Sequence, residues 1–265
     1  MGRILAFIYG IISYVLFLGA FCYAIAFVGD FWVPKTINSG SAGAFWPSLI
    51  INAGLLSLFA IQHSGMARPG FKKWWTKIIP EQIERSTYVL LASASLILLY
   101  WLWQPLPATI WSVENETGRW ILWGLFGFGW ILVVVCTFLI SHAHLFGLTQ
   151  VYDFLKARKL WNPNFQTPGL YRYMRHPMML GFFFAFWAIP EMTVGHLVFS
   201  IATTGYILIA LQLEEHDLLQ AFGEKYRQYR QRVPMFIPRP GYKAPMDTEE
   251  RSKKSPQPEN LATEK

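Results

Sequence analysis

The sequence is poor in charged side chains and in cysteine. Aspartate, glutamate, lysine and arginine make up 15% of the 265 residues, whereas soluble domains average about 25%. This deficit argues against an ordinary soluble domain. The two cysteines, Cys22 and Cys136, lie far apart inside apolar runs. Their positions exclude a disulfide framework and a cysteine metal site, and predict two buried free thiols.

The sequence also has no internal repeat at a solenoid period. The first apolar run, 4–28, is too long for the core of a signal peptide and lacks a small-residue cleavage site. We therefore expect it to be a retained transmembrane helix.

Long apolar runs are abundant. A hydrocarbon core of about 30 Å requires roughly 20 apolar residues per helix, and four runs reach that length: 4–28, 45–64, 87–106 and 119–141. The stretch 177–213 is too long for one span and is interrupted at AIPEMTVG, where Pro190 and Glu191 disfavour a helix in lipid. It predicts two helices, 177–189 and 194–213, joined by a tight turn. The fold predicted is all-α: a polytopic integral membrane helical bundle of five to six transmembrane helices with a C-terminal helical hairpin.

Basic residues are unevenly distributed between the predicted connections. The net charge is +7, and 20 of the 23 lysines and arginines fall in 66–85, 150–176 and 222–265. With six spans, these segments and both termini share one side, which the positive-inside rule assigns to the cytoplasm. The positive charge thus indicates a lipid bilayer as partner and no nucleic acid.

Five histidines fall at predicted cytoplasmic helix ends: His63, His142, His144, His176 and His216. One histidine at a helix end is most often a structural polar residue, but five on one face favour a shared polar site. The pair in SHAHLFG has no further ligand placed by sequence, so no metal site is predicted. GLFGFG, 124–129, has no preceding strand and predicts close helix packing rather than a nucleotide loop.

Two blocks near the C-terminus combine charge with aromatic residues: TPGLYRYMRHPMMLG, 167–181, and LEEHDLLQAFGEKYRQYRQRVPMFIP, 213–238. They are compatible with a helix cap followed by an amphipathic interfacial helix. They also suit a nucleoside joined to an amino acid. Glu214 and Glu215 can accept from ribose hydroxyls or an ammonium group, and Arg175 and His176 can meet a carboxylate. Nearby aromatic rings can cover an adenine face or a sulfonium cation.

These blocks resemble the C-terminal signature of the isoprenylcysteine carboxyl methyltransferase superfamily of integral-membrane enzymes, roughly G-x-Y-x-x-x-R-H-P-x-Y-x-G, E-E, F-G-x-E-Y-x-x-Y and V-P. Met179 stands where that pattern usually has tyrosine. The prenylcysteine enzymes have an arginine about one turn before the glutamates, where this chain has Ala210 and Leu211, which argues against a prenylated carboxylate acceptor. The resemblance implies S-adenosyl-L-methionine bound at the cytoplasmic face by Asn164, Phe165, Gln166, Tyr171, His176, Pro177, Met178, Met179, Gly181, Glu214, Glu215 and Tyr226.

The N-terminal half, including QHSGMARPGFKKWW and PEQIERSTYVLLASASL, resembles the NnrU-like branch of that superfamily, which contains bacterial enzymes that methylate methanethiol. The resemblance implies an inner-membrane enzyme that converts methanethiol, a small volatile thiol, to dimethyl sulfide, with no obligate protein partner inferred. A thiol must be deprotonated to attack a methyl group, and we expect His63, His142 and Arg175 to be the catalytic residues.

The predicted organisation is one membrane methyltransferase domain, 1–240, with its cofactor-binding part at about 160–238, followed by a disordered tail, 241–265. Three alternatives remain open at this stage. The acceptor could be another thiol or a prenylcysteine carboxylate, the protein could be an NADPH-dependent membrane reductase, or it could have no enzymatic role.

Overall fold

The computed structural model describes residues 2–159 and 165–238. Within them, five helices are long and apolar enough to cross a membrane: α1 (Arg3–Gly29), α2 (Phe45–Ala67), α4 (Glu81–Leu102), α5 (Glu116–Ile140) and α9 (Val194–Phe222). The shorter elements are α3 (Pro69–Trp75), α6 (His142–Leu145), α7 (Leu148–Leu155), η1 (Gly169–Arg172), α8 (Pro177–Trp187), α10 (Glu224–Arg232) and the strands β1 (Thr109–Ser112) and β2 (Glu191–Thr193). The predicted all-α polytopic membrane fold is confirmed, whereas the predicted tail lies outside the described residues.

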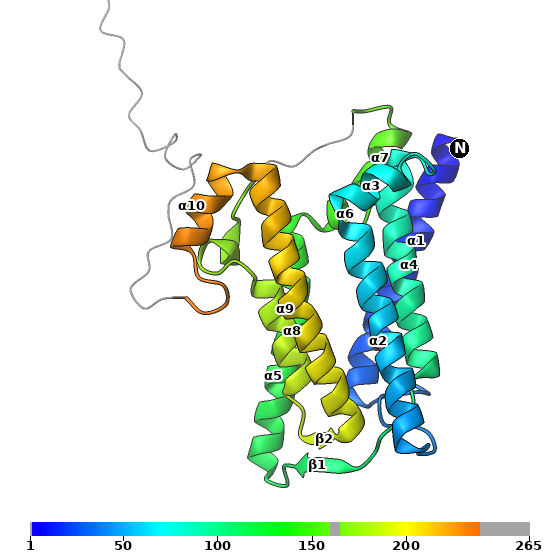
Figure 1. Ribbon diagram of the computed structural model, residues 1–265, viewed down its shortest axis with the longest axis vertical. Helices are drawn as coiled ribbons and strands as arrows, with labels where there is room; N and C mark the ends of the chain where they lie inside the picture. Colours follow the sequence, from blue (N-terminus) through cyan, green and yellow to red (C-terminus); the bar gives the residue numbers. More distant parts are fainter. Residues whose placement is uncertain (1, 160–164, 239–265) are drawn as a thin grey trace, which may run out of the picture.

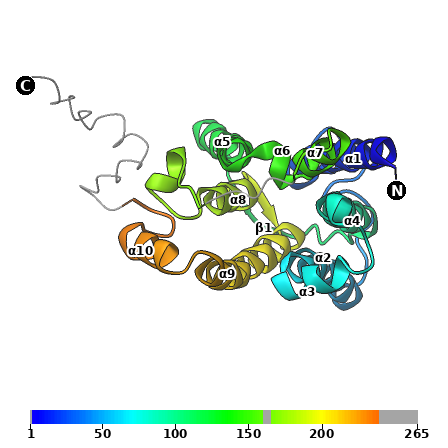
Figure 2. The same ribbon diagram turned by 90° about the horizontal axis from the view of Figure 1, so that it is seen from above.

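The long helices form two groups that stand side by side in Figure 1. One group contains α1, α2 and α4, and the other contains α5, α9 and the shorter α8, with α2 and α9 in contact between the groups (Figure 2). The N-terminus, α3, α6, α7 and α10 lie at one end, and β1 and β2 lie at the other (Figure 1). The first end carries most of the described lysines and arginines, so we call it the basic end; we call the other the strand end.

The predicted C-terminal hairpin forms, but its connection and its second helix differ from expectation. α8 has 11 residues and rises about 17 Å, little more than half of a bilayer core. The following chain is extended, and β2 pairs antiparallel with β1, so a strand pair replaces the predicted tight turn. α9 continues nine residues beyond the predicted end at 213, because no glycine or proline interrupts it before Gly223, which adopts a φ of 55°.

α5 and α8 pack with their backbones in close approach at two glycines. A Cβ atom on Gly129 would lie 2.6 Å from the carbonyl oxygen of Gly181, and one on Gly181 would lie 2.8 Å from the oxygen of Gly129. Neither position tolerates a side chain unless the helices separate. The interpretation of GLFGFG as a packing motif is confirmed at Gly129, whereas Gly124 and Gly127 have no neighbour within 4 Å of such an atom.

Aromatic side chains fill the space between the helices. Phe27, Tyr100, Trp103, Phe186 and Phe199 are buried in one continuous cluster. Large apolar side chains cover much of the outer surface, as expected for helices that face lipid. Cys136 is buried as predicted, but Cys22 is exposed, because its position on α1 faces away from the other helices.

Candidate active site

The two sequence blocks meet at Glu215, a buried residue of α9. Its Oε1 accepts hydrogen bonds from Arg175 Nε at 2.7 Å and from His176 Nε2 at 3.1 Å. Its Oε2 lies 3.1 Å from Nε of the more exposed Arg230. The side chains of His176 and Glu215 are 5% and 3% exposed. The expectation that the corner before α8 lies beside the paired glutamates is therefore confirmed for Glu215.

The chain that follows α10 holds the same corner from outside. Arg175 Nη1 donates to the carbonyl oxygens of Arg230 and Val233 at 3.0 and 2.6 Å. The backbone N–H groups of Arg175 and His176 donate to carbonyl oxygens in segment 234–235 at 2.9 and 3.1 Å. Because Nε and Nη1 of Arg175 are both engaged within the protein, these contacts fix the corner. The catalytic role of Arg175 stays a prediction.

Glu214 points to a different side of α9 from the glutamate that follows it, since successive helical residues are separated by about 100°. It is exposed and has no hydrogen bond or ion pair to any described residue. On the same stripe of α9, Tyr206 is hydrogen-bonded to Ser64 at 3.2 Å, and Asp217 pairs with Arg68 at 2.7 Å. Glu214 therefore faces the space between α9 and α2 with a carboxylate that a ligand can reach.

Tyr171, in η1, belongs to the first sequence block, 167–181, and lies close to α5. Its phenol lies near the buried Cys136, and its carbonyl oxygen accepts from the Tyr229 hydroxyl at 2.7 Å. Burial raises the pKa of Tyr171, and the neighbouring Cys136 and Glu214 raise that pKa further. The phenol therefore stays protonated at neutral pH and can donate a hydrogen bond.

Phe165 and α10 form an aromatic group beside the same corner. The Phe165 ring lies 5.3 Å from the ring of Phe222, 5.8 Å from Tyr226 and 5.4 Å from Tyr229. Tyr226 is 1% exposed, and its hydroxyl has no hydrogen-bond partner within the described chain. Burial, followed by the charge of Glu215, raises the pKa of Tyr226, so this hydroxyl is a protonated donor without an acceptor.

The other predicted cofactor-binding residues within the described chain lie before and along the first half of α8: Gln166, Pro177, Met178, Met179 and Gly181. Pro177 is the first residue of α8, where a missing N–H is tolerated. Met179 packs against the aromatic core, and Gly181 contacts α5. Asn164 lies outside the described residues.

His142 is hydrogen-bonded at both ring nitrogens. Thr137 donates its hydroxyl proton to the Val134 carbonyl at 2.7 Å, so Thr137 Oγ1 must accept from His142 Nδ1 at 2.8 Å. His142 Nε2 then carries the lone pair and accepts from the Tyr14 hydroxyl at 2.8 Å. Burial lowers the pKa of His142. Its lone pair is thus occupied within the protein.

His63 has fewer hydrogen-bond partners than His142. The Tyr88 hydroxyl lies 3.0 Å from each ring nitrogen of His63, so it can donate to one and accept from the other. No other side chain among residues 2–159 and 165–238 is hydrogen-bonded to the ring. The ring stacks on Phe59, whose ring lies 6.2 Å from that of Tyr206 on α9. Both histidines that were predicted to be catalytic lie in or next to the α1, α2 and α4 group, away from the Glu215 corner.

Sequence reasoning missed the contacts between α2 and α9. The Arg68–Asp217 and Ser64–Tyr206 pairs join residues about 145 positions apart in the chain, and the i, i+3 relation of Glu214 and Asp217 was the signal that could have placed them on one face. A groove of about 690 Å³ runs between these helices, lined mainly by apolar side chains and also by Ser64, Arg68 and Tyr206. No three His, Cys, Asp or Glu side chains of the described chain form a group that could hold a metal ion.

Several known proteins are similar in sequence to this chain over most of its length. The methanethiol S-methyltransferase of Mycobacterium tuberculosis is 54% identical over 91% of this chain and 98% of its own length. Enzymes of the same name from Crocosphaera subtropica and Pseudomonas deceptionensis are 48% and 51% identical, over 92% and 89% of this chain and 96% and 90% of their own. Nurim of Bos taurus is 29% identical over 64% of this chain and 68% of its own length.

No solved structure was found to match this chain. The sequence model of the NnrU protein family matches residues 51–235, which include most of α2, and all of α4, α5, the Glu215 corner and α10. This match covers more than half of the chain, and the near-full-length similarity to named relatives supports it. The chain therefore belongs to the NnrU family.

Proposed function

We propose that this protein is an S-adenosyl-L-methionine-dependent methyltransferase that converts methanethiol to dimethyl sulfide. The names of relatives that are about half identical over most of the chain support the reaction. The structural observation that carries the proposal is the meeting of the two sequence blocks at Glu215, which leaves the neighbouring Glu214 exposed and unpaired among the described residues.

Two polar groups near this corner fit the cofactor. The Glu214 carboxylate has no partner in the described chain, and the buried Tyr226 hydroxyl is a donor without an acceptor. Buried polar groups are nearly always hydrogen-bonded, so the unmet Tyr226 donor favours a polar ligand, and the free Glu214 carboxylate can also bind one. Glu214 can accept from ribose hydroxyls or an ammonium group, while Tyr171 and Tyr226 donate.

When bound, the cofactor supplies a methyl group carried on a sulfonium. The protein's part is to orient the acceptor, exclude water and remove a proton. His176 and Arg175 are already bound to Glu215, so they hold the corner rather than meet the acceptor. Leu211, in place of the arginine expected for a carboxylate acceptor, is 1% exposed within the aromatic core, which suits a small apolar acceptor.

We assign deprotonation of the thiol to His63 rather than His142. A neutral thiol is a weak nucleophile at pH 7, so a base must take its proton. The lone pair of His142 is occupied by the Tyr14 hydroxyl, whereas the one hydrogen-bond partner of the His63 ring in the described chain, Tyr88, lies equally far from both of its nitrogens. His63 would hold the thiol proton at a ring nitrogen while the carbon–sulfur bond forms.

The basic end is proposed to face the cytoplasm, in the inner membrane of a bacterium. Arg68, Lys72 and Arg85 lie at this end beside the candidate site, and the positive-inside rule favours retention of such residues in the cytoplasm. Both termini then lie in the cytoplasm, and the domain proposed at 1–240 has its cofactor part on the side where the cofactor is made.

The decisive experiment is headspace gas analysis of cells that express the protein and are fed methanethiol. Dimethyl sulfide should rise above the level in cells with an empty vector, and Glu214→Gln should reduce the rise at equal protein abundance. Binding of S-adenosylmethionine to the purified protein in detergent, measured by calorimetry, separates loss of cofactor from loss of chemistry.

Other outcomes distinguish the competing functions. Cofactor binding without dimethyl sulfide would leave a methyltransferase with another acceptor, and a methylated long-chain thiol or a methyl ester would identify it. Binding of NADPH instead of S-adenosylmethionine would replace the proposal with a reductase. No binding of either would refute the enzymatic assignment.

A further inference from the structure

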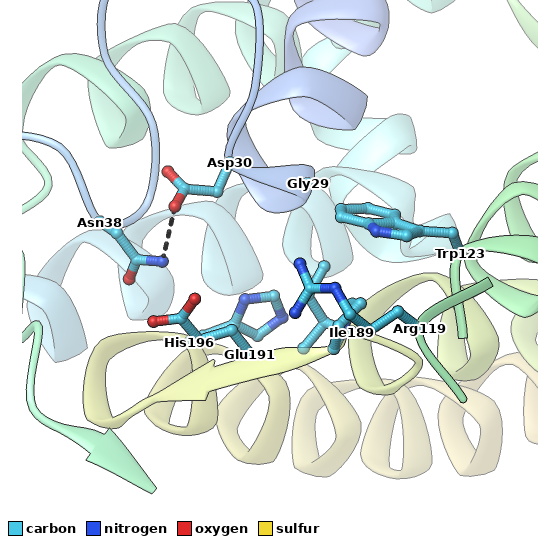
Figure 3. Close-up of a pocket in the computed structure, with 9 residues that line it drawn as sticks. Gly29, Asp30, Asn38, Arg119, Trp123, Ile189, Glu191 and His196 are labelled. Atoms are coloured by element: carbon cyan, nitrogen blue, oxygen red, sulfur yellow. Dashed lines mark hydrogen bonds between the residues drawn. The ribbon is translucent and has the colours of Figure 1, made fainter. Parts of the chain in front are cut away.

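A second polar pocket lies at the strand end, at the opposite end of the bundle from the candidate active site. Its volume is about 170 Å³, and its walls come from the end of α1, the loop after it, α5 and the corner between α8 and α9. Figure 3 shows Asp30 and Asn38 on one side of this space, Arg119 and Trp123 on the other, and Glu191 and His196 between them. None of these residues takes part in the proposed reaction.

A buried acceptor in this pocket lacks a donor. His196 is 1% exposed, and its Nε2 donates to the Phe186 carbonyl at 2.9 Å. The proton is therefore on Nε2, and Nδ1 carries a lone pair. Nδ1 has no hydrogen-bond partner among the described residues, although His196 lines the pocket. Buried polar atoms are rarely left unpaired, so a donor is expected here.

The acidic side of the pocket is built by a fixed network. The backbone N–H of His196 donates to Thr193 Oγ1 at 3.2 Å. The Thr193 hydroxyl donates to Asn38 Oδ1 at 2.6 Å, and Asn38 Nδ2 donates to Asp30 Oδ2 at 3.0 Å. The Thr36 hydroxyl donates to the other oxygen of Asp30. These bonds fix the Asp30 carboxylate in place before any ligand arrives.

Charges of both signs line the pocket without meeting each other. Within the described chain, Arg119 makes no ion pair with Asp30 or Glu191, and its hydrogen bond is to the Val113 carbonyl at 3.3 Å. A cation and two carboxylates that face one space but stay apart are complementary to a molecule with both charges. The volume admits about five or six water-sized groups, the size of a small amino acid.

We propose that this pocket binds a small zwitterion that carries an ammonium group and a carboxylate. The ammonium donates to His196 Nδ1 and to the carboxylates of Asp30 and Glu191, and the carboxylate accepts from Arg119. The ligand bridges α1 to α5 and α9, so it joins the two helix groups at the strand end. The proposal does not depend on the reaction at the basic end.

The test uses the full chain, purified in detergent, with glycine as the zwitterionic probe and methylammonium and acetate as its two halves. Calorimetry should show one glycine site, with each half at least about tenfold weaker, since each lacks one charged hydrogen-bond partner. Arg119→Gln and Glu191→Gln should each weaken glycine binding by about tenfold or more. Glu114→Gln, an exposed residue just before α5, is the matched control and should bind as the wild type does.

Both pocket variants should fold, because Glu191 is exposed and Arg119 is half-exposed with one long hydrogen bond. Unchanged unfolding temperatures without ligand verify this. A pocket that holds only water would give no heat with glycine, and that result overturns the proposal. Equal binding of glycine and its halves, or wild-type binding by Arg119→Gln and Glu191→Gln, overturns it as well.

Discussion

Glu214 and Glu215 are neighbours in sequence, and their structural environments predict opposite consequences when each is changed to glutamine. Glu215→Gln removes the charge that faces Arg175 and His176, whose side chains are 9% and 5% exposed. The change should therefore reduce stability. Glu214→Gln removes no bond to a described residue, so it should reduce cofactor binding while leaving stability intact.

The expected loss of stability in Glu215→Gln follows from the burial of its ion pairs. Removing one partner of a buried ion pair costs about 3–5 kcal/mol, because the remaining charge is left uncompensated. Glutamine keeps one oxygen that can accept from Arg175, and the 45% exposed Arg230 contributes little. We therefore expect the lower end, about 3 kcal/mol, for Glu215→Gln. At about 2–4 °C per kcal/mol for a chain of this size, the unfolding midpoint should fall by roughly 6–12 °C.

The assay measures both quantities on both variants in the same detergent. Thermal unfolding followed by circular dichroism gives the midpoint, and calorimetry with S-adenosylmethionine gives affinity. Glu214→Gln should unfold within about 1 °C of the wild type and bind the cofactor about tenfold or more weakly, as expected when a hydrogen bond to a charged group is lost. A wild-type midpoint for Glu215→Gln, or wild-type cofactor affinity for Glu214→Gln, would refute the division of roles.

Three further predictions concern packing, chemistry and pH. Gly129→Ala should lower the unfolding midpoint, because its Cβ would lie 2.6 Å from backbone atoms of α8, whereas Gly124→Ala, in open space on the same helix, should be neutral or slightly stabilising; equal midpoints would contradict the close approach. His63→Gln should reduce dimethyl sulfide formation about 100-fold or more while S-adenosylmethionine affinity stays within about twofold; unchanged turnover would exclude His63 as the base. Burial lowers the pKa of His142, so below about pH 6.5 the unfolded state binds a proton that the folded state does not. The stability of the protein should therefore fall as the pH drops through about 6.5. A smaller fall in His142→Gln would verify that His142 causes this dependence, and an identical fall would contradict it.

Several features of the fold follow from local sequence. Apolar runs of about 20 residues must become helices in lipid, because no water is present to bond an open backbone, and all five long helices lie where such runs were found. Gly129 was recognised as a packing position because small residues allow helices to approach each other in membranes. The connection at 188–193 was misjudged: a short α8 must be completed by extended chain, and β1, distant in sequence, supplies its hydrogen bonds.

The candidate site also has features that the sequence predicted and features that it did not. The two motif blocks and their meeting at one face could be predicted from residue type, order and the alternation of spans. The different orientations of Glu214 and Glu215 could not, because both belong to one apolar-to-polar transition and α9 was expected to end there. Since α9 continues to Phe222, the helical rotation directs one carboxylate into the corner and the other toward α2.

The sequence by itself determined the membrane class, the approximate positions of the five long helices and the identity of the polar blocks, because these depend on the length and composition of contiguous segments. Tertiary structure decided which polar groups are already bonded within the protein: Arg175 and His142 are occupied, whereas Glu214, Tyr226 and His196 retain an atom without a partner among the described residues. Hydrogen-bond saturation depends on residues far apart in the chain, and it becomes visible once the helices are packed.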